Sequence, residues 1–254
     1  MRHLQTAIGI PMSLEVRRCG LPRLELTDLV SRVFAVLEAD DLRFSTYRHD
    51  SEVSRINAGD LLMADASAEL TEVRVIAEEA ERASAGSFRC RTPHGALDLN
   101  GVVKGWSVQR ACRLLVAAGV ADFCFNAGGD VAVCGRAEPG RPWHVAVRSP
   151  FDQSALAVLA LSDAAAATSG LYERDAHLWD GRTGQTPTGL ASVTVVTGDL
   201  NVADVLATSI FAMGADGVAW AVARYDCAVL ACTPTGRLIG GGDIGARLAR
   251  PIAP

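Results

Sequence analysis

The sequence lacks any apolar run that reaches the ~18 residues a helix needs to cross a bilayer. It also lacks a cluster of basic side chains, since 24 lysines and arginines are outnumbered by 29 acidic residues and the formal net charge is −5. Non-specific nucleic-acid binding depends on such clusters. We therefore expect no transmembrane segment and no nucleic-acid partner.

Paired cysteine spacings are absent as well. Seven cysteines stand at positions 19, 90, 112, 124, 134, 227 and 232, and none forms a Cys-x-x-Cys pair. An odd, scattered set argues against a disulfide framework and favours a reducing compartment. Because residues 1–5 also run into a strand-like segment without the apolar core of a signal peptide, we expect a cytoplasmic protein.

What is present is enough apolar sequence for one sizeable core, 49% of 254 residues. Helical periodicity predicts helices over 68–84, 104–118, 202–213 and 215–224, and strand-like runs occupy 4–18, 123–126, 143–148, 154–161, 191–197 and 228–231. The elements intermix without a regular βαβ period, which predicts an α+β fold. We expect a single domain over residues 1–254, with a loosely attached tail from about residue 240.

The most informative segment is Asp98-Leu99-Asn100-Gly101-Val102-Val103-Lys104-Gly105. Its glycines allow the backbone to approach an anion, and its lysine can neutralise a phosphate. Neither GxxxxGK[ST] nor GxGxxG is present. The alternative is an ordinary strand-to-helix turn with a solvated lysine.

A second glycine segment, Asn126-Ala127-Gly128-Gly129-Asp130, follows a short strand. It is compatible with an anion-binding turn and equally with a hairpin turn. Ala167-Thr168-Ser169-Gly170 supplies two hydroxyls, or is an ordinary turn. His177, three residues before Asp180, is a candidate acid–base group because its pKa lies near neutrality, or a structural histidine.

The helix predicted over 202–213 carries a carboxylate in an apolar context. Asp204 and Thr208 are four residues apart and share one face. A buried carboxylate needs a partner, and Mg²⁺ with oxygen ligands would satisfy both side chains. Alternatively, Asn201 is the N-cap with Asp204 as the N3 residue of a capping box, and Thr208 bonds back to the carbonyl at 204.

Together these segments resemble the ApbE family, the FAD:protein FMN transferases, from Gly9 to Gly214. Each segment is weak evidence alone, but six in the same order make the resemblance specific. The matching segments are 45–47 with 50–57, 98–105, 126–130, 167–170 with Tyr172 and Arg174, 177–184, and 203–208. The resemblance implies one domain with a mixed, largely antiparallel sheet flanked by helices.

The resemblance also implies a reaction, in which FAD is split with the help of Mg²⁺, FMN is attached to a Ser or Thr of an acceptor protein, and AMP leaves. Asp204 and Thr208 would be side-chain ligands of Mg²⁺, with the carbonyls of Gly101 and Ala207 completing the site. His177 would lie near the reacting phosphate as the general base. The residues expected to contact FAD are Tyr47, Asp98, Lys104, Asn126, Gly128, Gly129 and Ser169.

The chain departs from the family pattern at three places. Ile8 stands where many members have Met, and Gly181 replaces the proline of a His-x-x-Asp-Pro pattern. The stretch 86–91 replaces a Phe-Asp-Pro-like segment. Two other functions fit the same residues: an FAD pyrophosphatase that yields FMN and AMP, and an FAD-binding protein without catalysis.

Overall fold

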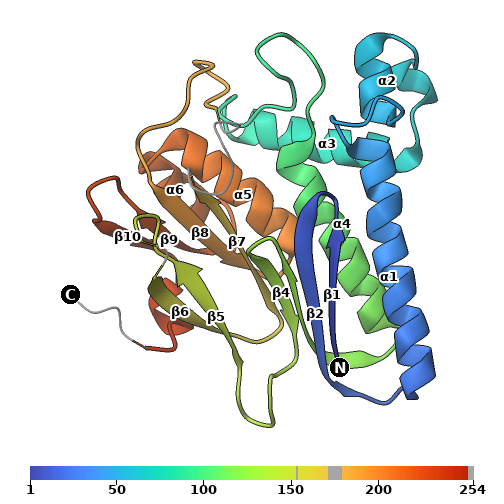
Figure 1. Ribbon diagram of the computed structural model, residues 1–254. Helices are drawn as coiled ribbons and strands as arrows, with labels where there is room; N and C mark the ends of the chain where they lie inside the picture. Colours follow the sequence, from blue (N-terminus) through green and yellow to red (C-terminus); the bar gives the residue numbers. More distant parts are fainter. Residues whose placement is uncertain (153, 171–178, 251–254) are drawn as a thin grey trace.

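The structure, a computed structural model, describes residues 1–152, 154–170 and 179–250 and confirms the predicted α+β organisation (Figure 1). The main sheet has the strand order β1-β2-β3-β4-β7-β8-β9-β10, and β5 and β6 form a separate hairpin. Every pairing among the described strands is antiparallel. The strands are β1 (Arg2–Ala7), β2 (Ile10–Cys19), β3 (Val120–Ala127), β4 (Asp130–Cys134), β5 (Trp143–Arg148), β6 (Ala155–Leu161), β7 (Ala164–Gly170), β8 (Ser192–Thr197), β9 (Ala228–Cys232) and β10 (Leu238–Gly241).

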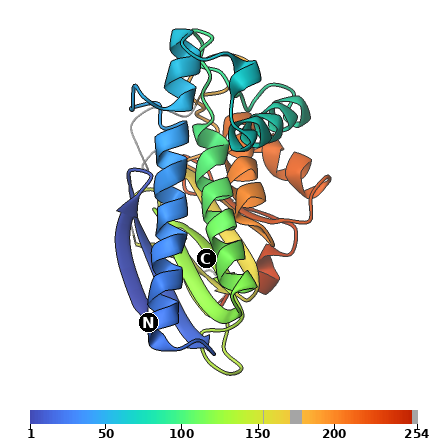
Figure 2. The same ribbon diagram turned by 90° about the vertical axis from the view of Figure 1, so that its right-hand side faces the viewer.

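Helices cover one face of the sheet, and Figure 2 shows the two longest running side by side along it. These are α1 (Arg23–Phe44) and α4 (Asn100–Ala117), followed by α5 (Leu200–Met213) and α6 (Asp216–Val222). A smaller core joins the start of α4 to α2 (Glu52–Ala58) and α3 (Ala68–Ala83), with a 3₁₀ turn, η1 (Met63–Asp65), between them. The last helix is α7 (Ile244–Arg247).

Both faces of the central strands are buried, because the β5–β6 hairpin and α7 cover the face opposite the large helices. Alternate residues of β4 show this division. Ala132 packs into the helical core, whereas Val131 and Val133 pack toward the hairpin. Every residue of β8 is consequently buried, which explains its uninterrupted Val-rich sequence.

The predicted strand over 4–18 is wrong in one respect, because it is a hairpin. Ile8 and Gly9 form the turn between β1 and β2, with φ values of 51° and 67°. A β-branched residue rarely adopts positive φ, so Ile8 gave no turn signal in the sequence. The turn places Ile8, Gly9 and Ile10 at the cavity described below.

The expected loose tail is also wrong as far as residue 250. Residues 238–241 form β10 against β9, and Ile244 of α7 is buried. The Ala249 N–H donates to the Val158 carbonyl at 2.7 Å. The described part of this segment is thus integral to the sheet and its second core.

Helices α4 and α5 approach each other unusually closely at Gly105. A Cβ at this position would lie 2.8 Å from the Asp204 Cβ and 2.9 Å from the Asn201 Cα. Real Cβ atoms do not come this close to backbone, so only glycine permits the crossing. The sequence pattern Lys104-Gly105 therefore has a packing role in addition to any role toward a ligand.

We predict that Gly105→Ala lowers the free energy of unfolding by about 1–3 kcal/mol, since overpacking against backbone outweighs the better helix propensity of alanine. Denaturant titration measures the change. Gly245→Ala in α7 is the matched control, because a Cβ there meets nothing within 4 Å. Equal stability of the Gly105→Ala variant and the parent would contradict the assigned close packing.

Candidate functional site

An open cavity of about 820 Å³ lies where the β1–β2 turn, the end of α1, the start of α4, β7 and α5 meet. Segments distant in the sequence therefore share one concave site, as is usual for binding a small molecule. Among the residues predicted to act, the cavity is lined by Tyr47, Asp98, Gly101, Lys104, Gly128, Ser169, Asp204 and Thr208.

The polar centre of the cavity is the carboxylate of Asp204, which is 3% exposed. Its Oδ2 accepts the Gly105 N–H at 3.0 Å, and its Oδ1 lies 3.5 Å from the Lys104 Nζ. Burial, opposed by the charge of Lys104 and assisted by that of Asp130, raises the pKa of Asp204 to about 7. A cation beside this carboxylate would favour its charged form.

Lys104 joins two buried carboxylates. Its Nζ lies 2.6 Å from the Asp130 Oδ2, in addition to its contact with Asp204. Asp130 is fully buried, and its Oδ1 accepts the Thr168 N–H at 3.0 Å. The residue was visible in the sequence only as the end of a glycine turn, so its role as a partner of Lys104 was missed.

The capping-box interpretation of Asp204 is wrong. The N-cap of α5 is Asp199, whose side chain accepts the N–H groups of Asn201 and Val202. Because this helix begins two residues earlier than predicted, Asp204 lies beyond its first turn and faces α4. The carboxylate is consequently free of a capping role.

The remaining predicted metal ligands lie close to Asp204 along α5 and α4. Thr208 is one turn after Asp204, and its Oγ1 lies 3.5 Å from the Ser169 Oγ of β7. In a regular helix the Gly105 N–H would donate to the Gly101 carbonyl. The Gly101 carbonyl and the Asp204 carboxylate therefore compete for this one donor. Ala207 is buried, and it is not among the described residues that line the cavity.

These groups offer only oxygen donors, a set that suits Mg²⁺. They include one carboxylate, a hydroxyl and carbonyls. The described ranges contain no group of three or more His, Cys, Asp or Glu side chains that could hold a metal ion. The donor set thus fits a cation that keeps open positions for oxygen atoms of a bound molecule.

The glycine turn at 126–130 is a hairpin turn between β3 and β4. The Gly129 N–H donates to the Asn126 Oδ1 at 3.1 Å, so both residues are engaged with each other. Gly128 alone of the predicted residues in this turn reaches the cavity, where it packs against Ile10; Asn126 and Gly129 are missing from the described lining. The turn contributes shape to the cavity wall.

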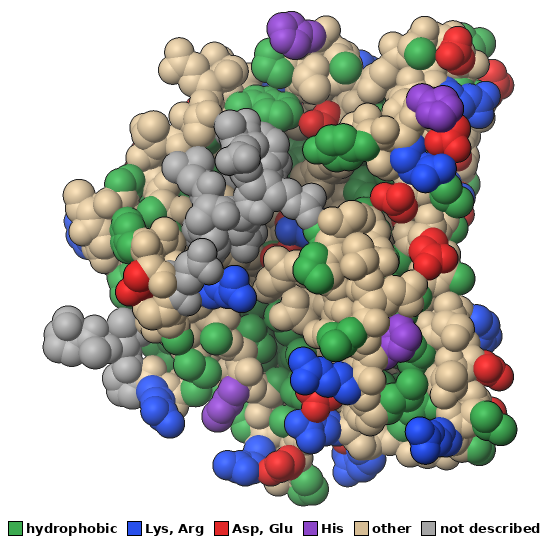
Figure 3. All heavy atoms as spheres, in the orientation of Figure 1, with side chains coloured by type: hydrophobic (Ala, Val, Ile, Leu, Met, Phe, Trp, Pro, Cys, Tyr) green, Lys and Arg blue, Asp and Glu red, His purple; other side chains and the backbone are tan. Residues whose placement is uncertain are grey.

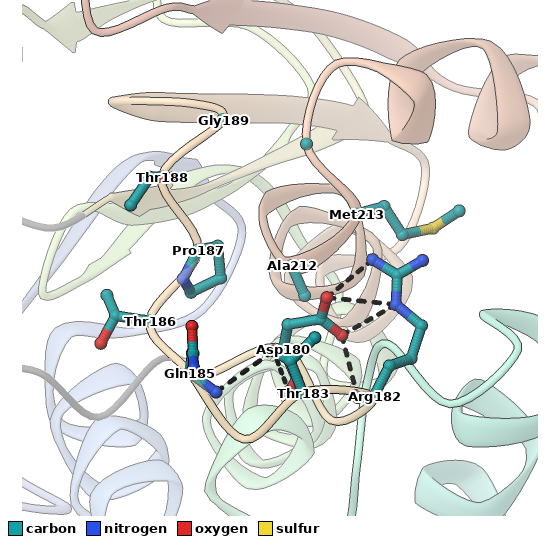
Figure 4. A pocket seen from close by; sticks show the side chains of 11 residues that line it. Asp180, Arg182, Thr183, Gln185, Thr186, Pro187, Thr188, Gly189, Ala212 and Met213 are labelled. Atoms are coloured by element: carbon teal, nitrogen blue, oxygen red, sulfur yellow. Dashed lines mark hydrogen bonds and ion pairs between the residues drawn. The ribbon is translucent and has the colours of Figure 1, made fainter.

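His177, with Tyr172 and Arg174, lies outside the described residues. The chain is described again from Trp179, which lines the cavity. Immediately afterwards Asp180 accepts three hydrogen bonds from the Arg182 side chain, two from Nε at 2.9 and 3.1 Å and one from Nη2 at 2.7 Å (Figure 4). These bonds lower the pKa of Asp180 and fix the turn over residues 180–185.

Figure 4 shows that Asp180 and Arg182 lie at a second, smaller hollow of about 280 Å³, between residues 182–189 and the end of α5. Its walls include Pro187, Gly189 and Met213. The Asp180–Arg182 pair is internally satisfied, so this hollow offers a ligand little unpaired charge.

Basic and acidic side chains are intermingled on the face seen in Figure 3. Within the described part of the chain, each helix is too short or too polar to span a bilayer. All seven cysteines are free thiols.

Comparison with known proteins assigns the chain to a family. The model of the ApbE family matches residues 89–231. The FAD:protein FMN transferase of Rhodobacter capsulatus is 31% identical over 211 residues, which are 79% of this chain and 37% of that protein. The chain thus spans well under half the length of that curated relative.

Solved structures share the fold over almost the entire chain. The flavin transferase ApbE from Vibrio cholerae gives a TM-score of 0.83 at 22% identity, covering 98% of this chain and 99% of that one. The ApbE protein from Thermotoga maritima gives 0.86 at 19% identity, with the same coverage. From the extent of the family match and the shared fold, the chain belongs to the ApbE family.

Proposed function

We propose that this protein is a Mg²⁺-dependent enzyme that transfers FMN from FAD to a Ser or Thr hydroxyl of an acceptor protein and releases AMP. The observation that carries the proposal is the buried Asp204 beside Lys104 in a cavity of about 820 Å³. We infer FAD as the substrate from the activity that the relatives' names state. The oxygen donors of the cavity are suitable ligands for the metal.

In this proposal Asp204 and Thr208 hold Mg²⁺ by their side chains, together with the carbonyls of Gly101 and Ala207. The metal would neutralise charge on the diphosphate of FAD. Lys104 contributes a second positive charge, and its position is fixed by the buried Asp130. Tyr47, Asp98, Gly128 and Ser169 contact the dinucleotide from the cavity wall.

The chemical step is a phosphoryl transfer. The acceptor hydroxyl oxygen forms a bond to the phosphorus of the FMN portion, the bond from that phosphorus to the oxygen of the AMP portion breaks, and AMP leaves. The hydroxyl proton must be removed, and we assign this to His177 because its pKa suits a general base near neutral pH. The paired Asp180 and Arg182 hold the turn that follows it.

The transfer itself is tested with FAD, Mg²⁺ and a candidate acceptor domain. We expect the acceptor to gain the mass of one FMN group and AMP to form in equal amount. An acceptor whose target Ser or Thr is replaced by Ala is the control and should gain no mass. AMP release at the same rate with and without acceptor would instead indicate an FAD pyrophosphatase.

The metal assignment predicts that Asp204→Asn lowers transfer by about a hundredfold or more, because a metal ion contributes several kcal/mol of charge stabilisation. Initial rates at increasing Mg²⁺ concentration measure the loss. Asp216→Asn, an exposed carboxylate-to-amide change in α6, serves as the control and should retain parental activity. Full activity of the Asp204→Asn variant would refute the assignment.

A pH dependence follows from the raised pKa of Asp204. Without metal, the native state keeps a proton between about pH 4 and 7 that the unfolded chain releases, so the free energy of unfolding falls as pH rises through this window, by at most about 1.4 kcal/mol per unit. Bound Mg²⁺ should remove this loss. Denaturant titrations at pH 5 and 8, with and without Mg²⁺, measure it.

The Asp204→Asn variant isolates the contribution of this one group, since its amide still accepts the Gly105 N–H and cannot titrate. From pH 5 to pH 8, we expect the free energy of unfolding of the metal-free parent to fall relative to that of the variant. A constant difference across this range would show that Asp204 has an ordinary pKa.

A further inference from the structure

Gly181 lies against the stretch 86–91, which is distant from it in the sequence. The Gly181 N–H donates to the Ser87 carbonyl at 2.9 Å, a bond that a proline at 181 could not make. A Cβ at 181 would lie 2.3 Å from both the Arg89 Cγ and the Gly86 carbonyl oxygen. Gly181 and the stretch 86–91 are therefore packed together, and the absence of a side chain at 181 makes room for Arg89.

The consequence of this packing is a cation in the cavity wall. Arg89 lines the large cavity, and its side chain is 49% exposed. Its stem packs on Gly181. The preceding residue, Phe88, is buried with its ring against Gly101 at the start of α4, where a Cβ would come within 2.8 Å of the ring. The stem of Arg89 and the residue before it are thus both packed, which lowers the cost of ordering this side chain on a ligand.

Three basic side chains line the cavity among the described residues, and the contact of Arg89 with a carboxylate is the longest of the three. Lys104 lies 2.6 Å from Asp130, and Arg48 lies 3.1 Å from Asp50. The Arg89 Nε is 3.8 Å from Glu81, beyond hydrogen-bond distance. A guanidinium offers five N–H donors in a planar fork that matches the oxygens of a phosphate.

We propose that Arg89 binds a phosphate group of the dinucleotide in this cavity and is a substrate-binding residue beyond those predicted from the sequence. The inference rests on the proposed function, since it takes FAD as the occupant. Gly181 is the positioning residue, because it admits the Arg89 stem to the wall. The acceptor protein plays no part in this contact.

Equilibrium binding of FAD, ADP and riboflavin to the complete protein tests the proposal without any turnover. Arg89→Met keeps the length of the stem and removes the charge. We expect it to weaken FAD and ADP about tenfold or more, as is typical for a charge-assisted hydrogen bond, and to leave riboflavin unchanged. Arg89→Lys should recover only part of the loss, because it lacks the fork.

Arg91→Met is the matched control, since Arg91 is an exposed arginine two residues on whose Nη1 donates to the Gly95 carbonyl outside the cavity. It should bind all three molecules like the parent. Gly181→Ala should reproduce the selective loss of FAD and ADP with Arg89 still present, because the new Cβ displaces the stem.

Three results would overturn the inference: unchanged FAD affinity in Arg89→Met, an equal loss of riboflavin, or an effect confined to the KM for the acceptor. Failure of the proposed function looks different. In that case the parent protein itself would not bind FAD, whatever residue stands at position 89.

Discussion

The close crossing of α4 and α5 at Gly105 is the constraint on which the rest of the site depends. Because no side chain separates the helices there, the backbone N–H of Gly105 reaches the Asp204 carboxylate directly, at 3.0 Å. The same crossing brings Lys104 beside Asp204. A wider separation would leave a buried carboxylate without its donor, which is costly in a low-dielectric interior.

The charges around this crossing form an alternating row from the sheet to α5. Asp130, at the start of β4, pairs with Lys104, and Lys104 approaches Asp204. Two buried carboxyl groups share one ammonium group, so the row carries an excess of negative charge only when both are ionised. An added cation would balance this excess and favour the ionised form of Asp204, which supports the proposed metal site.

Much of the fold could be predicted from sequence, because long periodic segments are governed by local patterns. The helix over 68–84 and the strand over 143–148 are examples, and both appear in the structure. The β1–β2 hairpin could not be predicted, since its turn uses Ile8 at positive φ in place of a usual turn residue. The ordered segment after residue 240 was missed because its stability comes from contacts with β9 and β6.

The site was predictable to a similar degree. Sequence motifs identified Asp204, Thr208 and Lys104, which do share one cavity. Spacing alone could not decide between a capped helix and a ligand site for Asp204, because the choice depends on Asp199 and on a neighbouring helix. Asp130 and Arg89 gave no usable signal, since the ion pair of Asp130 and the proposed role of Arg89 depend on residues 26 or more positions away, Lys104 and Gly181.

The wall of the cavity includes Ile8 and Gly9 from the β1–β2 turn as well as Asp204 and Thr208 from α5, almost 200 residues later. During synthesis, the β1–β2 hairpin leaves the ribosome long before α5 exists. The concave surface therefore cannot form until α5 has been made, because the contact between Gly105 and Asp204 joins residues that are 99 positions apart. A nascent chain that stops before α5 accordingly lacks the polar centre of the cavity.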